Sequence, residues 1–279
     1  MPELPEVEAI TRTLRPLVNG RRIRNVKVLH AIGVKPQKPG RLVRMARGQR
    51  VLTVERRGKY VCLELEKGLV TLHFKLDGQL IWFRNVQEME KAANTKPGGV
   101  HVDVAFQLEN GVLCFADGRH FGRVWAWRSA NECPGIEALG VDALSPRFTR
   151  GHFGRLLGKS KRGLKEFLLD QNRVAGIGNI YSCESLWRAK LDPQRAASSL
   201  TSTEAQRLHK AIVSILLRAL KCCLHPTPEF RDPEWWFQGL EKMLRVYDRE
   251  GKPCRRCGSR IKRITQGGRS TYYCARCQR

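Results

Sequence analysis

The chain has 279 residues, of which 42% are hydrophobic, a length that suits two domains or one large domain with a small appendage. Its 51 Lys and Arg against 26 Asp and Glu give a formal net charge of +25, which indicates a polyanionic partner. The basic residues are spread along the whole chain and no long apolar run, signal peptide or concentrated basic amphipathic helix is present, which argues against a membrane and for a nucleic-acid groove.

The first eight residues, MPELPEVE, contain a reactive group if Met1 is removed, because Pro2 then begins the chain with a free secondary amine. An α-amino group has a reference pKa of about 7.7 to 8.0 against about 10.4 for Lys, so its neutral nucleophilic form is easier to reach near neutral pH. Glu3 beside it can serve as general acid and base. On these residues alone, the ordinary alternative is a stiffened terminus with acidic residues that favour a helix start.

The first half of the chain predicts one helix followed by strands. Residues 5–19 have Pro at the start, acidic residues in the first turn, apolar residues at helical spacing and a following Gly. Alternating apolar and polar residues between turn pairs then predict an antiparallel β-sandwich. The expected strands lie near 22–30, 50–56, 60–66, 69–75, 79–84, 102–108, 112–116 and 123–128.

The second half predicts helices near 146–158, 162–170, 179–190 and 202–224, the last opened by the capping-box pattern Thr201-x-x-Glu204. Between them, VAGIGNIY places two glycines before Asn179, at the amino end of a helix whose N–H groups and dipole attract phosphate. A Gly-x-Gly sequence by itself is equally typical of a tight turn.

Ten cysteines divide into two groups. Four stand in paired CxxC steps, Cys254 with Cys257 and Cys274 with Cys277, and predict one structural Zn²⁺ held by a β-hairpin zinc ribbon. A pair of disulfides and an iron–sulfur cluster are the alternatives. The other six do not have the spacing of a disulfide framework. They are expected to be buried and to pack as small hydrophobic residues in a reducing cytosol.

MPELPEVE and the helix it opens resemble the amino terminus of the formamidopyrimidine-DNA glycosylase and endonuclease VIII family, base-excision repair enzymes that use an amino-terminal proline. The PELPE form looks more like the formamidopyrimidine branch. RRGKY, HFKLDG, DGRHFG, the stretch from Lys161 to GIGNIY, and TYYCARCQ resemble further family elements in the same order, so the resemblance covers nearly the whole chain.

The resemblance implies an α+β fold. Its parts would be an N-terminal antiparallel β-sandwich catalytic domain with a flanking helix over 1–130, a linker over 131–144, a helix-two-turns-helix DNA-binding domain over 145–243 and a zinc-ribbon finger over 244–279. It also implies catalytic roles for Pro2, Glu3, Lys59 and Arg269. Lys59 would approach the DNA backbone and assist β-elimination, and Arg269 at the tip of the finger would grip phosphate and serve δ-elimination. Without the resemblance both are ordinary exposed basic residues.

The DNA-binding residues implied by the resemblance are Leu76, Arg119, Phe121, Lys161 and Asn179. Leu76 of HFKLDG would be an apolar wedge, and Arg119 and Phe121 of DGRHFG would fill the space left by an extruded nucleotide, because the vacated stack and the orphaned base both need partners. Asn179 and Lys161 would contact phosphate. As isolated residues, Leu76 and Phe121 are more often core and Arg119 a surface charge.

Two positions of HFKLDG depart from the family pattern, with Lys75 in place of Gly and Asp77 in place of Ser, which bears on the wedge and on the preferred partner base. The segment 225–243 departs as well, because the branch has a glycine-rich stretch there. Its aromatic residues Trp235, Trp236 and Phe237 are read either as stacking on DNA or as packing between domains.

The function implied is that of a monomeric, cytoplasmic DNA glycosylase and abasic-site lyase acting on damaged double-stranded DNA through a Schiff base on Pro2 and β,δ-elimination. PELPE and D-x-R-x-F-G favour oxidised purines such as 8-oxoguanine and formamidopyrimidines, while residues 225–243 leave oxidised pyrimidines open. A non-catalytic DNA-binding paralogue and a zinc-ribbon RNA-binding factor are the alternatives from other classes.

Overall fold

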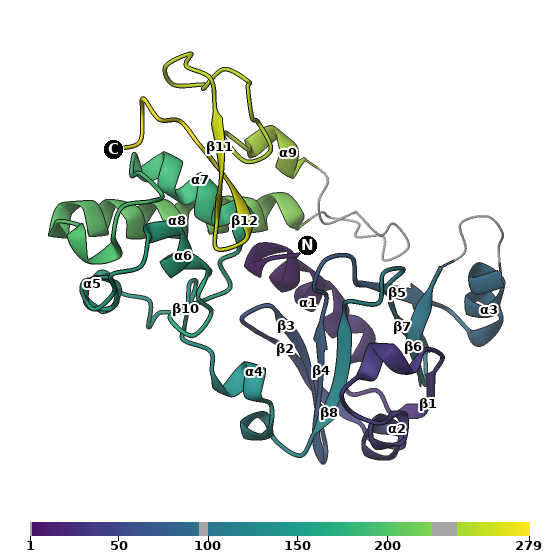
Figure 1. Cartoon of the computed structure of the whole chain (residues 1–279). Coiled ribbons are helices and arrows are strands. Elements are labelled where there is room, and N and C mark those ends of the chain that lie inside the picture. The colour runs from purple at the N-terminus through teal and green to yellow at the C-terminus, as the bar shows by residue number, and fades with distance from the viewer. Residues whose placement is uncertain (1, 95–99, 225–238) are drawn as a thin grey trace. The chain divides into compact units, whose positions relative to one another are not determined.

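The computed structural model describes residues 2–94, 100–224 and 239–279 and divides them into two compact units (Figure 1). The first unit contains Pro2, Glu6–Glu137, Cys223 and Leu224, and the second contains Glu3–Pro5, Ala138–Cys222 and residues 239–279. The chain therefore contributes Glu3–Pro5 to the second unit before it builds the first. The predicted aromatic contacts of residues 235–237 lie outside the described residues.

Helix α1 (Leu4–Val18) confirms the predicted amino-terminal helix to within one residue at each end. Its apolar residues Val7, Ile10, Leu14 and Val18 are buried on one face, as their spacing predicts. The Arg15 Nε donates a hydrogen bond of 2.8 Å to the carbonyl oxygen of Val54. The amphipathic stripe and this bond together hold the helix against the first unit.

In the described part of the first unit, two four-stranded antiparallel sheets confirm the predicted sandwich. Phe74, the residue after the last strand residue His73 of the second sheet, and Phe115 of the first sheet are both buried and stack with ring centroids 6.1 Å apart. The first sheet has the order β1 (Ile23–Val28), β6 (Val102–Leu108), β7 (Gly111–Ala116), β5 (Gln79–Phe83). The second has the order β2 (Val51–Arg57), β3 (Tyr60–Leu65), β4 (Gly68–His73), β8 (Arg123–Trp127).

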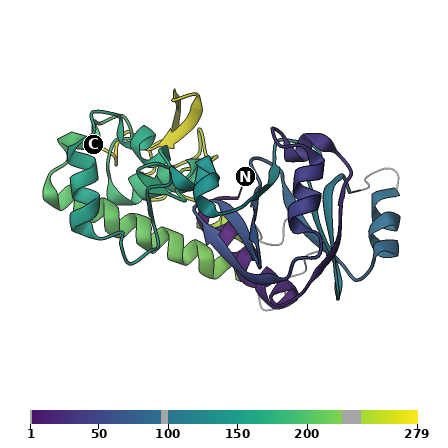
Figure 2. The same cartoon turned by 90° about the horizontal axis from the view of Figure 1, so that it is seen from below.

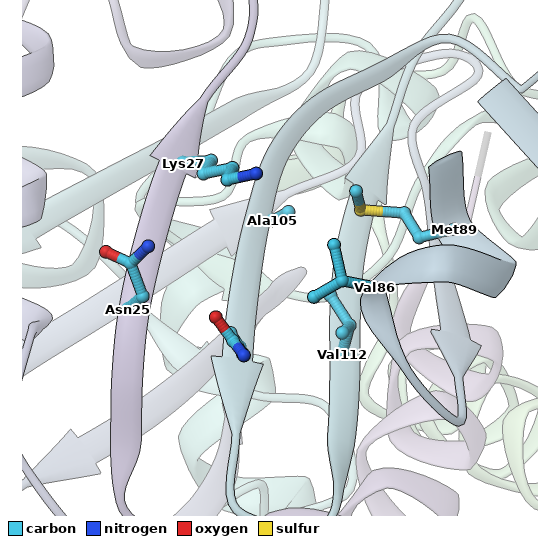
Figure 3. A pocket seen from close by; sticks show the side chains of 7 residues that line it. Asn25, Lys27, Val86, Met89, Ala105 and Val112 are labelled. Atoms are coloured by element: carbon cyan, nitrogen blue, oxygen red, sulfur yellow. The ribbon is translucent and has the colours of Figure 1, made fainter. Parts of the chain in front are cut away.

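Short helical elements that the sequence patterns did not predict lie between these strands or directly after the last of them. They are η1 (Ala31–Val34), α2 (Pro39–Ala46), α3 (Val86–Asn94), η2 (Ala130–Glu132) and α4 (Pro134–Glu137). Met89 of α3 packs with Ala105 and Val112 of the first sheet, and Figure 3 shows the small pocket that remains between them. Its volume is about 10 Å³, room for roughly one water molecule, so α3 acts as a cover for the sheet.

The second unit is mainly helical, with α5 (Arg150–Gly158), α6 (Leu164–Leu169), α7 (Asn179–Ala189), η3 (Ala197–Ser199) and α8 (Ser202–Cys223), the long green helix of Figure 2. The predicted helix 146–158 begins later, at Arg150, because the Thr149 side chain caps it by accepting from the His152 N–H at 3.2 Å. The predicted capping box is confirmed, since Glu204 accepts from the Thr201 N–H at 2.9 Å and Thr201 accepts from the Glu204 N–H at 3.2 Å.

The remaining elements of the second unit are a parallel pair, β9 (Val141–Asp142) with β10 (Val174–Ala175), the short helix α9 (Leu240–Met243), and a hairpin, β11 (Lys262–Gln266) with β12 (Arg269–Tyr273). β12 lies beside α7 (Figure 1). Among the cysteines outside the CxxC pairs, Cys222 is only half-buried, which corrects the expectation that all six are buried. No helix in the described ranges is long and apolar enough to cross a membrane.

Candidate functional site

The Glu3 carboxylate is bound to the amino end of α7. Its Oε2 accepts from the Gly178 N–H at 2.7 Å and the Tyr181 N–H at 3.4 Å, and its Oε1 accepts from the Ile180 N–H at 2.8 Å. Glu3 is only 1% exposed. Three N–H groups at the helix end that the sequence pattern offers to phosphate thus bind a carboxylate of the chain itself.

Pro2 and Glu3 are both buried, so the residue that carries the proposed nucleophile and the neighbouring carboxylate are shielded from bulk water. In the full sequence Met1 precedes Pro2, so the Pro2 nitrogen is an amide until Met1 is removed. Met1 lies outside the described residues.

The glycines of VAGIGNIY make room for the amino terminus. Gly176 has φ +99°, and a Cβ there would lie 2.3 Å from the Leu4 side chain. The Leu4 N–H donates to the Gly176 carbonyl oxygen at 3.1 Å. Gln171 braces the same loop, accepting from the Gly176 N–H at 2.9 Å and donating to the Ile177 carbonyl oxygen at 2.7 Å. Gln171 was not among the predicted residues, and only its place before a glycine-rich turn could have indicated it.

Asn179 is the first residue of α7 and is half-buried, with its side chain beside Tyr247. Glu3 takes the N–H groups of Gly178, Ile180 and Tyr181 but not that of Asn179. The backbone N–H groups of Arg245, Val246 and Tyr247 all donate to the buried Glu184 carboxylate, at 2.9 to 3.0 Å. Glu184 therefore fixes the segment that faces Asn179.

Lys59 lies in the turn between β2 and β3, after Gly58 with φ +57°, and is only 8% exposed. Burial lowers the pKa of His73 to about 3, and the charges of Lys75 and Lys59 act in the same direction. His73 therefore stays neutral, and its Nδ1 accepts from the Lys75 N–H at 3.0 Å. Since Tyr60 pairs with His73 across β3 and β4, Lys59 and the HFKLDG turn lie at the same end of the second sheet.

An ion-pair network that sequence reasoning missed supports α1 near this end. Glu8 accepts from Arg12 at 2.7 Å and from Arg56 at 2.8 Å, and Arg56 also donates to the Gly58 carbonyl oxygen at 2.9 Å. Burial raises the pKa of Glu8, but the two guanidinium groups outweigh it and hold the pKa below its usual value. Glu8 thus ties α1 to the turn that carries Lys59.

Leu76, Arg119 and Phe121 lie on two loops of the first unit that meet. Arg119 forms an ion pair with Asp77 of the HFKLDG turn, and its guanidinium carbon is 5.7 Å from the centre of the Phe121 ring. Leu76 is 43% and Phe121 50% exposed, unlike core residues. Two large apolar side chains and a planar cation therefore project from one end of the sandwich.

Asp117 shapes the second of these loops. Its carboxylate is buried and accepts from the N–H groups of Arg119 at 3.0 Å and Gly122 at 2.5 Å. A Cβ on Gly122 would lie 2.5 Å from the Phe115 ring, so no other residue fits there. The DG…G spacing of DGRHFG thus encodes a rigid loop that presents the side chains between its ends.

The four CxxC thiols gather within 4.8 Å of one another. The Sγ atoms of Cys254 and Cys277 are 4.0 Å apart and those of Cys257 and Cys274 are 3.5 Å apart. Zn–S bonds of about 2.3 Å require tetrahedral edges of about 3.8 Å, which these distances bracket. The four cysteines form one structural zinc site, and with all four positions taken by protein it offers none to a substrate.

The hairpin that carries Arg269 is anchored by Lys165, which is fully buried. The Lys165 Nζ donates to the Ser270 carbonyl oxygen at 2.6 Å and to the Thr271 hydroxyl at 2.7 Å. Burial lowers the pKa of Lys165, and the nearby Arg269 acts in the same direction. Lys165 was not among the predicted site residues, and its position among apolar residues in LKEFLL was the available signal.

Arg269 itself is exposed and follows Gly267 and Gly268, whose φ values of +53° and +72° close a two-residue hairpin turn. With Arg162 and Gln171 it lines an open cleft of about 510 Å³ within the second unit. Lys161 is exposed but does not line this cleft, whereas its neighbour Arg162 does.

Family profiles match three parts of the chain: the formamidopyrimidine-DNA glycosylase N-terminal domain at residues 1–124, the H2TH domain of the same glycosylase at 139–225, and a zinc finger found in FPG and IleRS at 251–279. The chain is 37% identical to the formamidopyrimidine-DNA glycosylase of Pelotomaculum thermopropionicum, covering 100% of this chain and 99% of that protein. It is 39% identical to the formamidopyrimidine-DNA glycosylase of Thermus thermophilus, covering 100% of this chain and 98% of that protein.

Solved structures agree with these matches. The crystal structure of the MutM (Fpg) protein from Thermus thermophilus has a TM-score of 0.83 and 36% identity, with 99% of this chain and 98% of that chain covered. Lactococcus lactis Fpg in complex with DNA containing N7-benzyl-Fapy-dG has a TM-score of 0.85 and 29% identity, with 99% of each chain covered. The sandwich, the helical unit and the four-cysteine finger all have counterparts along these full-length matches, and the chain belongs to the formamidopyrimidine-DNA glycosylase family.

Proposed function

We propose that the chain excises oxidised purines from DNA and then cleaves the strand, using Pro2 as nucleophile. Family membership makes it a DNA glycosylase of base-excision repair that acts on damaged double-stranded DNA as a monomer. The observation that carries the proposal is the Glu3 carboxylate, held beside Pro2 by three N–H groups of α7. A carboxylate held this rigidly is suited to proton transfer at a sugar or leaving group.

In the proposed reaction, the neutral amine of Pro2 attacks C1′ of the flipped nucleotide, and the electron pair of the N-glycosidic bond leaves with the base, which takes up a proton. The C1′–O4′ bond then opens with protonation of O4′, which leaves an iminium on Pro2. Glu3 assists the proton transfers. The iminium acidifies C2′; loss of a C2′ proton expels the 3′ phosphate, and a second elimination expels the 5′ phosphate.

The other site residues receive supporting roles. We assign Lys59 to the β-elimination and Arg269 to the phosphate at the lesion and the δ-elimination. We assign Leu76, with Arg119 and Phe121, to the gap left by the flipped nucleotide, because such a gap needs an apolar wedge and hydrogen-bond donors for the orphaned base. Asn179 and Lys161 would contact phosphates. Residues 1–130, 145–243 and 244–279 would be the catalytic, helix-two-turns-helix and finger domains, joined by a linker over 131–144.

Oxidised purines are favoured because the curated relatives are named for formamidopyrimidine, a ring-opened purine product. Oxidised pyrimidines remain the second candidate, since a Lactococcus lactis Fpg structure contains an oxidised pyrimidine in its DNA. Incision of duplexes that differ only in carrying 8-oxoguanine, a formamidopyrimidine or an oxidised pyrimidine ranks the two. We infer a cytoplasmic location from the DNA substrate and the reduced thiolates of the zinc site.

Borohydride trapping tests the nucleophile. The chain is made with a removable amino-terminal extension, and mass spectrometry verifies that cleavage exposes Pro2. The cleaved form should give a covalent adduct with abasic-site DNA, and the uncleaved form, which has every side chain but no free amine, should bind the DNA without an adduct. Equal trapping by both forms would exclude Pro2, and binding with no adduct in either form would support a non-catalytic paralogue.

A further inference from the structure

Two histidines and an aspartate that the proposed function does not use meet at one end of the first sheet. His30 follows β1, Asp103 lies in β6 and His120 follows β7, and β6 pairs with both neighbours. The Asp103 Oδ1 lies 3.3 Å from the His30 Nδ1 and 2.8 Å from the His120 Nδ1. Three potential ligand atoms, one from each residue, lie within 4.8 Å of one another.

The backbone is shaped to bring these side chains together. The ladder between β6 and β7 is irregular between Val102 and Val104, which places Asp103 at a bulge, a feature that redirects a side chain. The N–H of His30 donates to the Asp103 carbonyl oxygen at 3.2 Å. A Cβ on Gly33 would lie 2.8 Å from the Asp103 Cβ, so a glycine is needed for this close approach.

The carboxylate at the centre of the cluster is incompletely satisfied. Asp103 is 0% exposed, and among the described residues no hydrogen-bond partner lies next to its Oδ2. A buried charged oxygen without a partner is costly, and the buried Asp117 carboxylate nearby adds negative charge. The His30 and His120 side chains are 47% and 30% exposed, so a small cation can reach the cluster from solvent.

We propose that His30, Asp103 and His120 bind a second Zn²⁺ ion, separate from the four-cysteine site. Two imidazoles and one carboxylate form a ligand set typical of zinc with an open position. Bonds of about 2.0 Å give tetrahedral ligand–ligand edges of about 3.3 Å, which His30 and Asp103 already match and His120 reaches by moving roughly half an ångström. Zn²⁺ binding displaces the protons in the hydrogen bonds between the imidazole nitrogens and the Asp103 carboxylate, and between the His30 Nδ1 and the Val102 carbonyl oxygen.

This second site would act on the loop that presents Arg119 and Phe121. His120 stands between them and has φ +54°. Residues other than glycine rarely adopt a positive φ, so other contacts must hold His120 in this conformation. A zinc ion bound by both His120 and Asp103 of β6 fixes that loop to the sheet. This consequence for the loop rests on the proposed function, whereas metal binding itself is measured without DNA and does not.

The test is metal stoichiometry in the full-length chain equilibrated at buffered micromolar free Zn²⁺. The variants are His30→Gln and His120→Gln, with His152→Gln on α5 as the matched control. Substitution by Co²⁺ counts the four-cysteine site separately, because only thiolate ligands give thiolate-to-cobalt charge-transfer absorption. Far-UV circular dichroism checks folding, and the half-exposed His30 can be replaced with little disturbance of the packing even if His120→Gln loosens the loop.

The wild-type chain and His152→Gln should each bind two zinc ions, and His30→Gln and His120→Gln should each bind one, with thiolate-to-cobalt absorption unchanged in all four proteins. A wild-type chain that binds only one zinc overturns the proposal, since the cluster is then a hydrogen-bonded brace. Two zinc ions in both cluster variants overturn it as well, because the second ion then lies elsewhere.

Discussion

The Glu3 Oε2 accepts a 2.7 Å hydrogen bond from the Gly178 N–H, a residue 175 positions further along the chain. The carboxylate next to the proposed nucleophile is therefore fixed by the glycine-rich turn before α7. In this way Glu3–Pro5, from the middle of PELPE, and the GIGNIY stretch form a single structural feature within the second unit.

Replacing Glu3 with Gln should slow base excision by about 10²-fold or more, because the amide cannot transfer the proton. Incision of DNA with a preformed abasic site should fall less, since the base has already left. The amide also leaves one N–H of α7 without its acceptor, at a cost of about 1 to 3 kcal/mol. Single-turnover rates on the two substrates and the melting temperature measure these effects.

The matched control for this change is Glu90→Gln on α3, since Glu90 is exposed and pairs with the equally exposed Lys27 at 3.7 Å. It should leave both rates unchanged. Equal losses on the two substrates for Glu3→Gln would mean that Glu3 acts by positioning the amino terminus and not by proton transfer.

Asp77→Ser should change discrimination between partner bases. Asp77 pairs with Arg119, and their side chains are 41% and 55% exposed, so the pair contributes at most about 1 kcal/mol to stability. Without Asp77, all guanidinium donors of Arg119 are available to an orphaned base. The ratio of incision rates opposite dC and opposite dA should shift by up to about fivefold, the equivalent of roughly 1 kcal/mol.

Asp77→Asn is the control for this change, because it removes the charge but keeps a hydrogen-bond acceptor for Arg119, and it should shift the ratio less. If Asp77→Ser and the wild type gave the same ratio, the ion pair would have no part in reading the partner base.

The strands and long helices were predictable because their apolar periodicity is local. Six of the eight predicted sandwich strands end within one residue of their observed bounds, whereas the strand predicted over 22–30 ends at Val28 and the one over 69–75 at His73. α2 and α3 were missed because two or three turns carry too few apolar residues to show a period. In α3, the face that packs on the sheet is marked by Val86, Met89 and Ala92, one residue per turn.

Site residues with a motif around them were predictable, and those defined by distant partners were not. The four cysteines have diagnostic spacing, and Leu76 and Phe121 sit in recognisable turns. Lys165 depends on a hairpin more than 100 residues away, and Asp103 depends on loops that follow two other strands. Such contacts are made by tertiary structure, and no local pattern encodes them.

Lys165→Met should loosen the hairpin that carries Arg269. The change leaves the Ser270 carbonyl oxygen and the Thr271 hydroxyl without the buried ammonium, at a cost of about 1 to 3 kcal/mol. A less fixed Arg269 should favour products of β-elimination over those of δ-elimination. Product ratios on abasic-site DNA and the rate of zinc removal by a chelator measure the two consequences.

Lys159→Met is the control for Lys165, since Lys159 is exposed and precedes the same helix. It removes the same charge without touching the hairpin and should keep the product ratio of the wild type. An unchanged ratio in Lys165→Met would show that its anchoring of the hairpin does not govern Arg269.

Glu204→Gln should reveal acid-sensitive stability at the start of α8. Hydrogen bonding from Arg195, at 2.7 Å, is the main cause that lowers the pKa of Glu204 from 4.5 to about 2, and Thr201 contributes. A folded-state pKa below the unfolded one gives stability that is present above about pH 4.5 and is lost as pH falls toward about 2. Because the pair is partly exposed and solvent screens its charges, the effect at neutral pH is at most about 1 kcal/mol.

Thermal unfolding of wild type and variant, followed by circular dichroism between pH 7 and pH 2.5, measures this difference. The wild type should be more stable than Glu204→Gln at pH 7, and the gap should narrow progressively below about pH 4.5, because protonation converts the carboxylate into a group that, like Gln, carries no charge. Zinc loss in acid affects both proteins alike and cancels in the comparison. A gap that is constant across this range would mean that Glu204 supports α8 through its neutral hydrogen bonds and not through its charge.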